Sequence, residues 1–294
     1  MLTIVTAVIV THNPPDGMVE RLEAVLNQID RVVVVDNGSG DALTLPHDDR
    51  IAIIRNEENK GLAVALNQGI QHALISHANW VLLLDHDSTP EPGMVTRMLT
   101  AYQAYSEKDR IGLIAPEIKD ENTTEKTRYL ISKGKFSFQR MELKTPYNDE
   151  VLSVITSGSL IKAPVFKDAG VMPEHFFIDY IDYAFCLSLK KAGYNILLVR
   201  GAVLQHRLGD KKEHGIAGAK VITSNHSAER PYTIFRNRVW LWKRYAAVFP
   251  GFVMHDVLAA GFDVLRITFC EKEKGQKLKA VLRGIRAGLR GEPV

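Results

Sequence analysis

The stretch Val81-Leu82-Leu83-Leu84-Asp85-His86-Asp87 joins an unbroken apolar run of strand length to two acids placed one residue apart. Such a run is typical of a strand buried on both faces, as in a parallel sheet. Ligands of open α/β sheets bind beyond the carboxyl ends of the strands, where Asp85 and Asp87 would lie. Two neighbouring carboxylates repel each other unless a cation lies near them, and a hard divalent ion that also binds phosphate oxygens suits them. A plain Asp-rich turn is the alternative.

The first 115 residues or so alternate between apolar strand patterns and helical patterns. Strands are expected at Thr6–Val10, Val32–Val35, Ile51–Arg55 and Trp80–Leu84, with helices at Met18–Gln28 and directly after Gly61. This alternation predicts a doubly wound, mainly parallel sheet. Because the carboxyl ends of such strands share one edge, the polar residues that end them should line one crevice.

The rest of the chain has a different pattern. Alternation in Lys133–Tyr147 predicts antiparallel strands, Ile196–Val199 a further strand, and residues from Ala228 onward a helical, aromatic and basic region. We therefore expect a domain over residues 1–227, with a nucleotide-binding half (1–115) and an acceptor half (116–227), and a helical region over 228–294.

Composition narrows the class of protein. Apolar residues make up 46% and charged residues 24%, as in ordinary globular proteins, and the net charge of +3 is too small to indicate nucleic-acid binding. The only two cysteines, Cys186 and Cys270, lie in apolar contexts, which favours buried thiols in a reducing compartment. The start of the chain predicts a strand rather than a signal peptide. The most apolar long stretch, Tyr245–Ile267, contains Pro250 and two acids and makes a poor bilayer span.

Seven ordered segments carry a family resemblance. They are Val10–Asn13, Val35–Ser39, Asn59–Asn67, Leu83–Asp87, Phe176–Asp182, His206–Asp210, and Tyr232 with Arg236-Asn237. With these segments, over about residues 5 to 240, the chain resembles family 2 glycosyltransferases of the GT-A fold, and among them bacterial rhamnosyltransferases that use dTDP-rhamnose.

The resemblance implies a Rossmann-like mixed, mainly parallel sheet flanked by helices, with a C-terminal helical extension. It implies an inverting, metal-dependent transfer of L-rhamnose from dTDP-β-L-rhamnose to a hydroxyl of a cell-surface glycan, lipopolysaccharide or lipid-linked acceptor. A UDP-sugar donor (GlcNAc or Gal) and a non-catalytic nucleotide-sugar-binding protein are the alternatives. An NAD-linked enzyme is disfavoured because Thr11-His12-Asn13-Pro14 stands where a Gly-x-Gly-x-x-Gly loop would be needed.

The same resemblance assigns the donor site. Asp36 would accept the N3–H of a uracil or thymine base. The remaining donor contacts would come from Thr11, His12, Asn13, Asn59, Gly61, Asn67, Asp85 and His86. The helix after Gly61 could also direct its N-terminus at the diphosphate. The metal ligands would be Asp87, Asp85 and His206, with Asp87 ranked first; the ion would be Mg2+ or Mn2+, and an imidazole suits Mn2+ better.

Asp182 is the expected catalytic base, near the start of a helix predicted over residues 183–192. A structural N-cap is the alternative role for Asp182, and Asp179 competes with it as base. Candidate acceptor or diphosphate contacts are Asp179, Gly158, Arg207, Tyr232, Arg236 and Asn237. Ile181, Ala184 and Ser188 depart from the family pattern of charged residues and bear on acceptor contacts.

A basic amphipathic pattern begins at Lys272. It combines cations with Leu278, Val281, Leu282, Ile285 and Leu289 at helical spacing, which is typical of a helix at a membrane surface. A helix packed on its own domain, or a dimer contact, would give the same pattern. We therefore expect a cytoplasmic protein that could act at the inner face of the cytoplasmic membrane.

Overall fold

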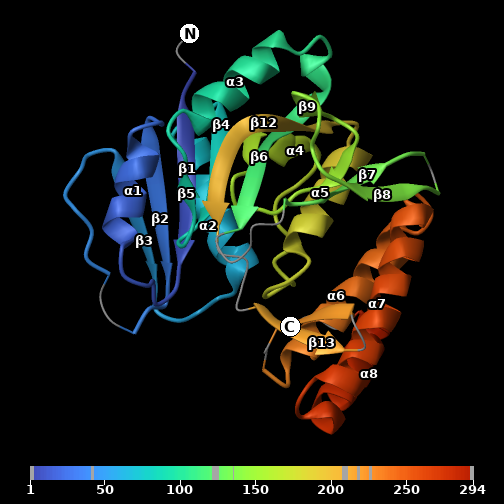
Figure 1. Ribbon diagram of the computed structural model, residues 1–294. Coiled ribbons are helices and arrows are strands. Elements are labelled where there is room, and N and C mark those ends of the chain that lie inside the picture. Colours follow the sequence, from blue (N-terminus) through green and yellow to red (C-terminus); the bar gives the residue numbers. More distant parts are fainter. Residues whose placement is uncertain are drawn as a thin grey trace. The chain divides into compact units, whose positions relative to one another are not determined.

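The computed structural model describes residues 3–40, 43–120, 126–134, 136–206, 211–216, 219–224 and 227–291, with backbone only for 211–216 and 219–224. It divides into two compact units (Figure 1). Unit 1 comprises Met1–Ser132, Gln139–Phe177 and Ile181–Arg207, and unit 2 comprises Lys133–Phe138, Ile178–Tyr180 and Leu208–Val294. The functional boundaries expected after residues 115 and 227 stay predictions.

Unit 1 is built on a mixed, mainly parallel sheet, as predicted. Its parallel half consists of β1 (Val5–Thr11), β2 (Arg31–Asn37), β3 (Ile51–Asn56) and β4 (Trp80–Asp85), in the order β3-β2-β1-β4. The sheet continues through β11 (Leu160–Lys162), β6 (Ile111–Asp120), β12 (Asn195–His206) and β5 (Thr89–Pro90), and β9 (Tyr147–Asn148) pairs with β12. β11 runs antiparallel to both of its neighbours.

Helices cover this sheet because its strands are apolar on both faces. Every residue of β1 is buried, as are Val32–Val35 of β2. The helices of unit 1 are α1 (Met18–Leu26), α2 (Leu62–Ile75), α3 (Met94–Ala104), the short η1 (Lys108–Arg110), α4 (Val165–Asp168) and α5 (Ile181–Lys191). Gly69 of α2 lies so close to β1 that a Cβ there would be 2.3 Å from Val8 Cγ1, so only glycine allows this packing.

A second, three-stranded sheet has the order β10 (Val151–Ser153), β7 (Tyr129–Ser132) and β8 (Phe138–Met141), and β10 runs antiparallel to β7. Of the antiparallel strands expected over Lys133–Tyr147, the structure has β8 and the first residue of β9, which runs antiparallel to β12. The helix expected over 183–192 begins two residues earlier, at Ile181.

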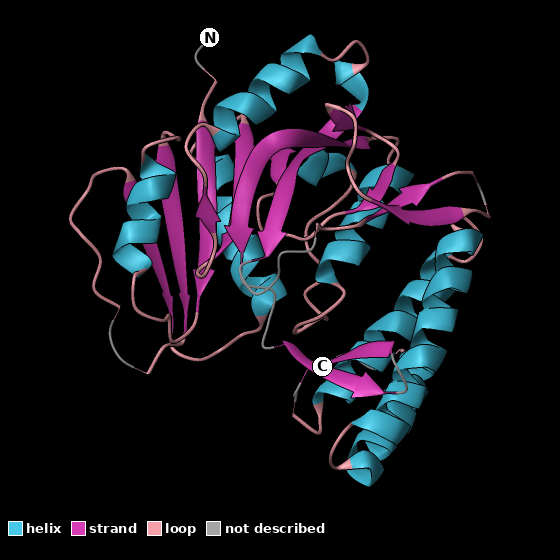
Figure 2. Cartoon of the chain, in the orientation of Figure 1, coloured by secondary structure: helices cyan, strands magenta, loops and turns pink. Residues whose placement is uncertain are grey.

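Unit 2 contains three long helices, α6 (Arg230–Tyr245), α7 (Pro250–Cys270) and α8 (Lys274–Arg290), which lie side by side in Figures 1 and 2. Their shared core includes Phe235, Ala260, Ile267 and Val281. A hairpin of β13 (Lys211–Ile216) and β14 (Ala219–Ser224), which the sequence pattern did not reveal, precedes them. Among the described helices, none has the length and apolar character that a membrane crossing requires.

Candidate functional site

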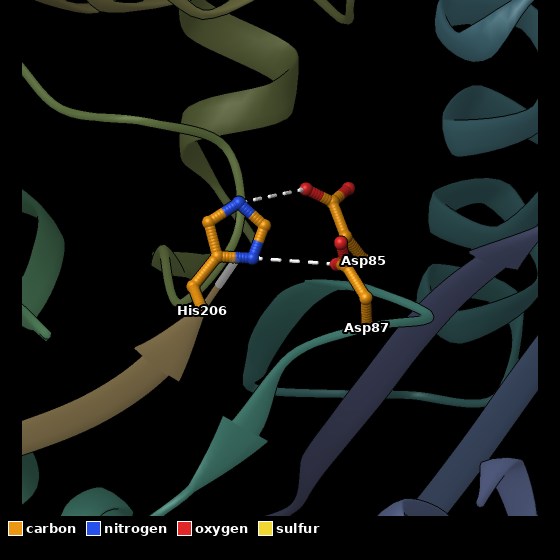
Figure 3. A group of neighbouring side chains, drawn as sticks. All are labelled: Asp85, Asp87 and His206. Carbon is orange, nitrogen blue, oxygen red and sulfur yellow. Dashed lines mark ion pairs between the residues drawn. The ribbon is translucent and has the colours of Figure 1, made fainter. Parts of the chain in front are cut away.

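Two acids and a histidine meet at the carboxyl edge of the sheet of unit 1. Asp85 ends β4, Asp87 lies in the following turn, and His206 ends β12. Although β4 and β12 are not neighbours, β5 begins two residues after Asp87 and pairs with β12 next to its end, with Thr89 opposite Gln205. This pairing brings Asp87 Oδ1 to 3.3 Å from His206 Nδ1, and Asp85 Oδ2 lies 3.8 Å from Nε2 (Figure 3).

Burial and mutual proximity shift all three groups. Burial raises the pKa of Asp85, and the Asp87 charge raises it further while His206 lowers it. Burial opposes ionisation of Asp87 as well, but the neighbouring imidazole holds the pKa of that carboxyl below its ordinary value. Burial likewise disfavours the His206 imidazolium, yet the carboxylates of Asp87 and Asp85 raise its pKa overall. The site therefore concentrates negative charge around one imidazole.

The arrangement fits a divalent cation. One ligand atom from each of Asp85, Asp87 and His206 lies within 4.8 Å of the others. Asp87 Oδ1 is buried and has no hydrogen-bond partner among the described residues, although His206 Nδ1, which also contacts Ser88 Oγ at 2.8 Å, lies 3.3 Å away. A buried, unsatisfied carboxylate oxygen is costly unless a cation or donor satisfies it.

Two serines and an arginine support this group, and the sequence analysis missed them. Ser157 Oγ accepts the Asp85 backbone N–H at 3.0 Å and lies 2.7 Å from Ser88 Oγ. Arg21 of α1 donates to the His86 carbonyl at 2.8 Å and so fixes the turn that carries the acids. The position of Ser88 directly after the acids was the one available clue; Ser157 and Arg21 are distant in sequence.

Gly158, a predicted acceptor or diphosphate contact, lies beside the same strand end. Its N–H donates to the Leu83 carbonyl at 2.7 Å. A side chain there would collide with Pro116, 2.7 Å away.

The predicted base-binding residues gather at the ends of β1 and β2. Thr11 pairs with Asp36 in the register of these strands, and Val10 pairs with Asp85 on the other side of β1. Asp36 and Asp85 are thus two strand spacings apart, about 10 Å, a span suited to a nucleoside diphosphate. Thr11 Oγ1 is buried without a hydrogen-bond partner among the described residues.

Hydrogen bonds tie the loops of this edge together. Asp36 accepts both the N–H and the hydroxyl of Ser39, and Arg55 lies 3.4 Å from its second oxygen. The carbonyl of Asn37 lies 3.1 Å from His12 Nδ1, and its amide donates to Asn59 Oδ1 at 2.9 Å. Asn13 binds the loop as well, through Ser39 Oγ and the Gly40 N–H. The structure brings together Thr11, His12, Asn13, Asp36 and Asn59.

Two of the predicted donor contacts have partners within the chain, and their role in donor binding stays a prediction. Asn67 donates to the Met172 carbonyl and to Glu174 and accepts the Met172 N–H, all at 2.9 Å, so its amide anchors a loop. The N-terminus of α2 is not open to a diphosphate through its first N–H, because Leu62 donates to the Phe177 carbonyl at 2.8 Å.

The segment Ile178–Tyr180, which belongs to unit 2, is held by residues of α6. Asp179 and Tyr180 both adopt left-handed backbone conformations, with φ of 65° and 66°, which are uncommon for these residues. Arg230 binds both carboxylate oxygens of Asp179, at 2.9 and 3.1 Å. Asn237 donates to the carbonyls of Ile178 and Asp179 at 3.0 and 2.9 Å. These contacts stabilise the strained turn.

The same contacts involve two residues predicted to touch acceptor or diphosphate. Arg236 and Asn237 are 3% and 0% exposed, and Arg236 donates to the Asn237 side chain, so in this structure both support the turn and their contact with a substrate stays a prediction. Tyr232 is half-buried with its ring next to the guanidinium groups of Arg236 and Arg283. Arg207 lies outside the described residues.

Asp182 and Asp179 differ in what surrounds them. Both carboxylate oxygens of Asp179 are occupied by the two-point contact with Arg230. Asp182 is half-buried and is the second residue of α5, so it is not the N-cap; one oxygen accepts the Tyr183 N–H at 2.8 Å. Its second oxygen is the candidate base.

Comparison with known proteins decides the family. Residues 6–168 match the model of glycosyl transferase family 2. The chain belongs to this family. Within it, the chain is 28% identical, over 81% of its length and 79% of the relative, to the dTDP-rhamnosyl transferase RfbF of Shigella flexneri. It is 29% identical to the galactofuranosyltransferase GlfT1 of Mycobacterium tuberculosis, over 59% of this chain and 60% of the relative.

Solved structures show the same fold. GalNAc-T7, crystallised with UDP, GalNAc and Mn2+, superposes with a TM-score of 0.60 at 13% identity; the match covers 99% of this chain and 56% of that one. Residues 1–349 of Staphylococcus aureus TarS, in complex with UDP-GlcNAc, give a TM-score of 0.57 at 16% identity, covering 97% and 81%. The family 2 chain is a glycosyltransferase of the GT-A fold, as the sequence resemblance implied.

Proposed function

We propose that this glycosyltransferase transfers L-rhamnose from dTDP-β-L-rhamnose, with inversion, to a hydroxyl of a cell-surface glycan, lipopolysaccharide or lipid-linked acceptor. The similarity to a dTDP-rhamnosyl transferase, which extends over four-fifths of both chains, is the observation that carries the proposal. A role in polysaccharide biosynthesis follows from it.

The donor would lie along the carboxyl edge of the sheet, with its base at Asp36 and its diphosphate at Asp85 and Asp87. A carboxylate at Asp36 can accept the N3–H of the base, while Thr11 and Asn59 line the same edge. A divalent cation held by Asp85, Asp87 and His206 would offset the charge that develops on the departing nucleoside diphosphate. Arg21 and Ser157 keep the two acids in place for that task.

Asp182 would take the proton of the acceptor hydroxyl as it attacks from the face opposite the diphosphate. The Asp182→Asn variant keeps an oxygen for the Tyr183 N–H but loses the base, so kcat should fall by about 100- to 10,000-fold. Asp109→Asn serves as the control, because it removes the charge of an exposed acid of η1 that takes no part in the site. Turnover near the wild-type value in Asp182→Asn, with donor affinity unchanged, would exclude Asp182 as the base.

A UDP-sugar donor is the second candidate. It is favoured by the similarity to a galactofuranosyltransferase and by the fold shared with a UDP-GlcNAc complex. An Asp carboxylate reads uracil and thymine alike at N3, so Asp36 does not separate the two donors.

Calorimetric titration of the full chain with Mn2+ and a panel of dTDP-rhamnose, UDP-GlcNAc and UDP-galactose tests the donor. The expected result is tightest binding of dTDP-rhamnose, with dTDP released when a glycan acceptor is added. Tighter binding of a UDP-sugar, with release of UDP, would show that the donor is that UDP-sugar and not dTDP-rhamnose. Failure of all three donors to bind would contradict both candidates.

We also propose that the reaction takes place in the cytoplasm, at the inner face of the cytoplasmic membrane. Cys186 and Cys270 are both unbridged, which suits a reducing compartment. A lipid-linked acceptor would place the enzyme at the membrane surface.

A further inference from the structure

α7 has one face in the core of unit 2 and an opposite face that is apolar and exposed. Phe252, Ala260 and Ile267 are buried. The exposed large side chains are Met254, Val257, Leu258, Phe262, Leu265 and Phe269, each 45% to 72% accessible. Five of them recur at intervals of four, four, three and four residues, so they form one stripe about 22 Å long. We call these six residues the α7 stripe.

The stripe carries no charge of its own. Asp256 and Asp263, the two acids of α7, point into unit 2, where Arg238 lies 3.6 Å from Asp256 and 2.8 Å from Asp263. The Trp242 indole and the Tyr180 hydroxyl also donate to Asp256. A face with so many large apolar groups and no acid is unusual on a monomer and marks an interaction site.

α8 adds positive charge beside the stripe. Its sequence from Lys274 to Arg290 contains six Lys and Arg residues and no acid. Leu278 and Ile285 pack on the core cluster that includes Ala260 and Ile267 of α7. Leu282 and Leu289 follow them at i+4, on the same side of α8, and are 68% and 61% exposed. The apolar surface of α7 therefore continues onto α8.

The exposed cations of α8 lie next around the helix. Four of them are Lys279, Arg283, Arg286 and Arg290, of which Arg283 pairs with Glu229, and Lys274 is exposed at the start of the helix. The sequence left open whether the apolar side of α8 lies at a membrane or packs on its own domain; Val281, 3% exposed, belongs to the core, whereas Leu282 and Leu289 stay exposed.

We propose that the α7 stripe, together with Leu282 and Leu289, docks on an anionic lipid bilayer, with α7 lying in the plane of the interface. An exposed apolar face bordered by cations suits a surface that offers both acyl chains and negative headgroups. A second copy is the less suitable occupant, because an isologous contact would bring two rows of α8 cations together. The membrane binding itself does not depend on the proposed function. Only its role, access to a lipid-linked acceptor, rests on that function.

Co-sedimentation of the full chain with vesicles tests the inference without donor or acceptor, so that its outcome is independent of the proposed reaction. We expect binding to vesicles that contain phosphatidylglycerol and not to pure phosphatidylcholine. The double variant Phe262→Glu with Phe269→Glu should bind at least tenfold more weakly. Ile75→Glu is the matched control, since it changes an apolar residue that is 71% exposed in unit 1 and should bind like wild type.

The charge contribution has its own variant. Lys279→Gln with Arg286→Gln should weaken binding by about fivefold for each cation removed, and salt should have a similar effect on the wild type. No binding to anionic vesicles, or equal binding by the Phe262→Glu and Phe269→Glu variant, would overturn the proposal. Light scattering that shows a wild-type dimer, abolished in that variant, without vesicle binding would assign the stripe to a second copy of this chain.

Discussion

Replacement of Gly61 by alanine should destabilise unit 1 strongly, although the substitution adds only one methyl group. Gly61 precedes α2 with φ 87° and ψ 157°, a backbone region that is essentially restricted to glycine. A Cβ at this position would lie 2.8 Å from Phe177 Cδ2 and 3.0 Å from the Phe177 carbonyl oxygen. That carbonyl accepts the Leu62 N–H, so Phe177 cannot withdraw without losing the bond.

The two costs add. The backbone strain is about 1–3 kcal/mol, and the collision with a packed neighbour costs about 1–3 kcal/mol more. We therefore expect Gly61→Ala to lower the free energy of unfolding by about 4 kcal/mol. Gly93→Ala is the control: Gly93 has φ 77° and ψ 11°, a left-handed conformation that costs an alanine about 1–2 kcal/mol. Its nearest contact, at 3.1 Å, is the far end of the Arg97 side chain, which can shift at less cost than the Phe177 backbone.

Urea unfolding of both variants, followed by circular dichroism, gives the comparison. The midpoint of Gly61→Ala should fall clearly below that of Gly93→Ala, and donor turnover should fall with it because the Phe177 segment leads to Asp182. Equal midpoints for the two variants would refute the close approach of Phe177 to α2.

Two further predictions concern buried polar groups. Asn67→Ala removes three hydrogen bonds to Met172 and Glu174. The free energy of unfolding should therefore fall by about 2–3 kcal/mol, while the KM for the donor stays unchanged. A raised KM with normal stability would instead indicate that Asn67 contacts the donor. Burial raises the pKa of Cys186 to about 12, whereas an unfolded thiol titrates near pH 8.5. The folded chain then holds a proton that the unfolded chain releases, so the free energy of unfolding should fall as pH rises from about 8.5 towards 12. Urea midpoints at pH 8 and pH 10 measure this, and Cys186→Ala should show a flatter dependence; identical slopes for wild type and variant would contradict it.

The sequence predicted the parallel half of the sheet well because each strand is a continuous apolar run that ends in polar residues. β1, β2, β3 and β4 all occur within a residue or two of the expected bounds. The proximity of His206 to Asp85 and Asp87 was implied by the family resemblance. Hydrophobic pattern alone could not give it, because it depends on the pairing of the two-residue strand β5 with β12.

Residues that act through tertiary contacts could not be predicted. The type of an amide side chain does not reveal its partner, so the sequence did not show that Asn67 anchors a loop and Asn237 a strained turn. The left-handed conformations of Asp179 and Tyr180 could not be predicted, because neither position is a glycine. The apolar spacing in α8 predicted a helix at a surface. In the structure Val281, one residue of that spacing, lies in the core, and α7 carries the longer row of exposed apolar residues.

Mn2+ titration by electron paramagnetic resonance tests the central claim most directly, since the proposed reaction requires a cation at Asp85, Asp87 and His206. The wild type should bind one Mn2+ per chain, more tightly when dTDP is present. Asp87→Asn should weaken this binding at least tenfold, while Asp109→Asn, at an exposed acid of η1, should leave it unchanged. Binding of Mn2+ by Asp87→Asn as tightly as by the wild type would contradict the account.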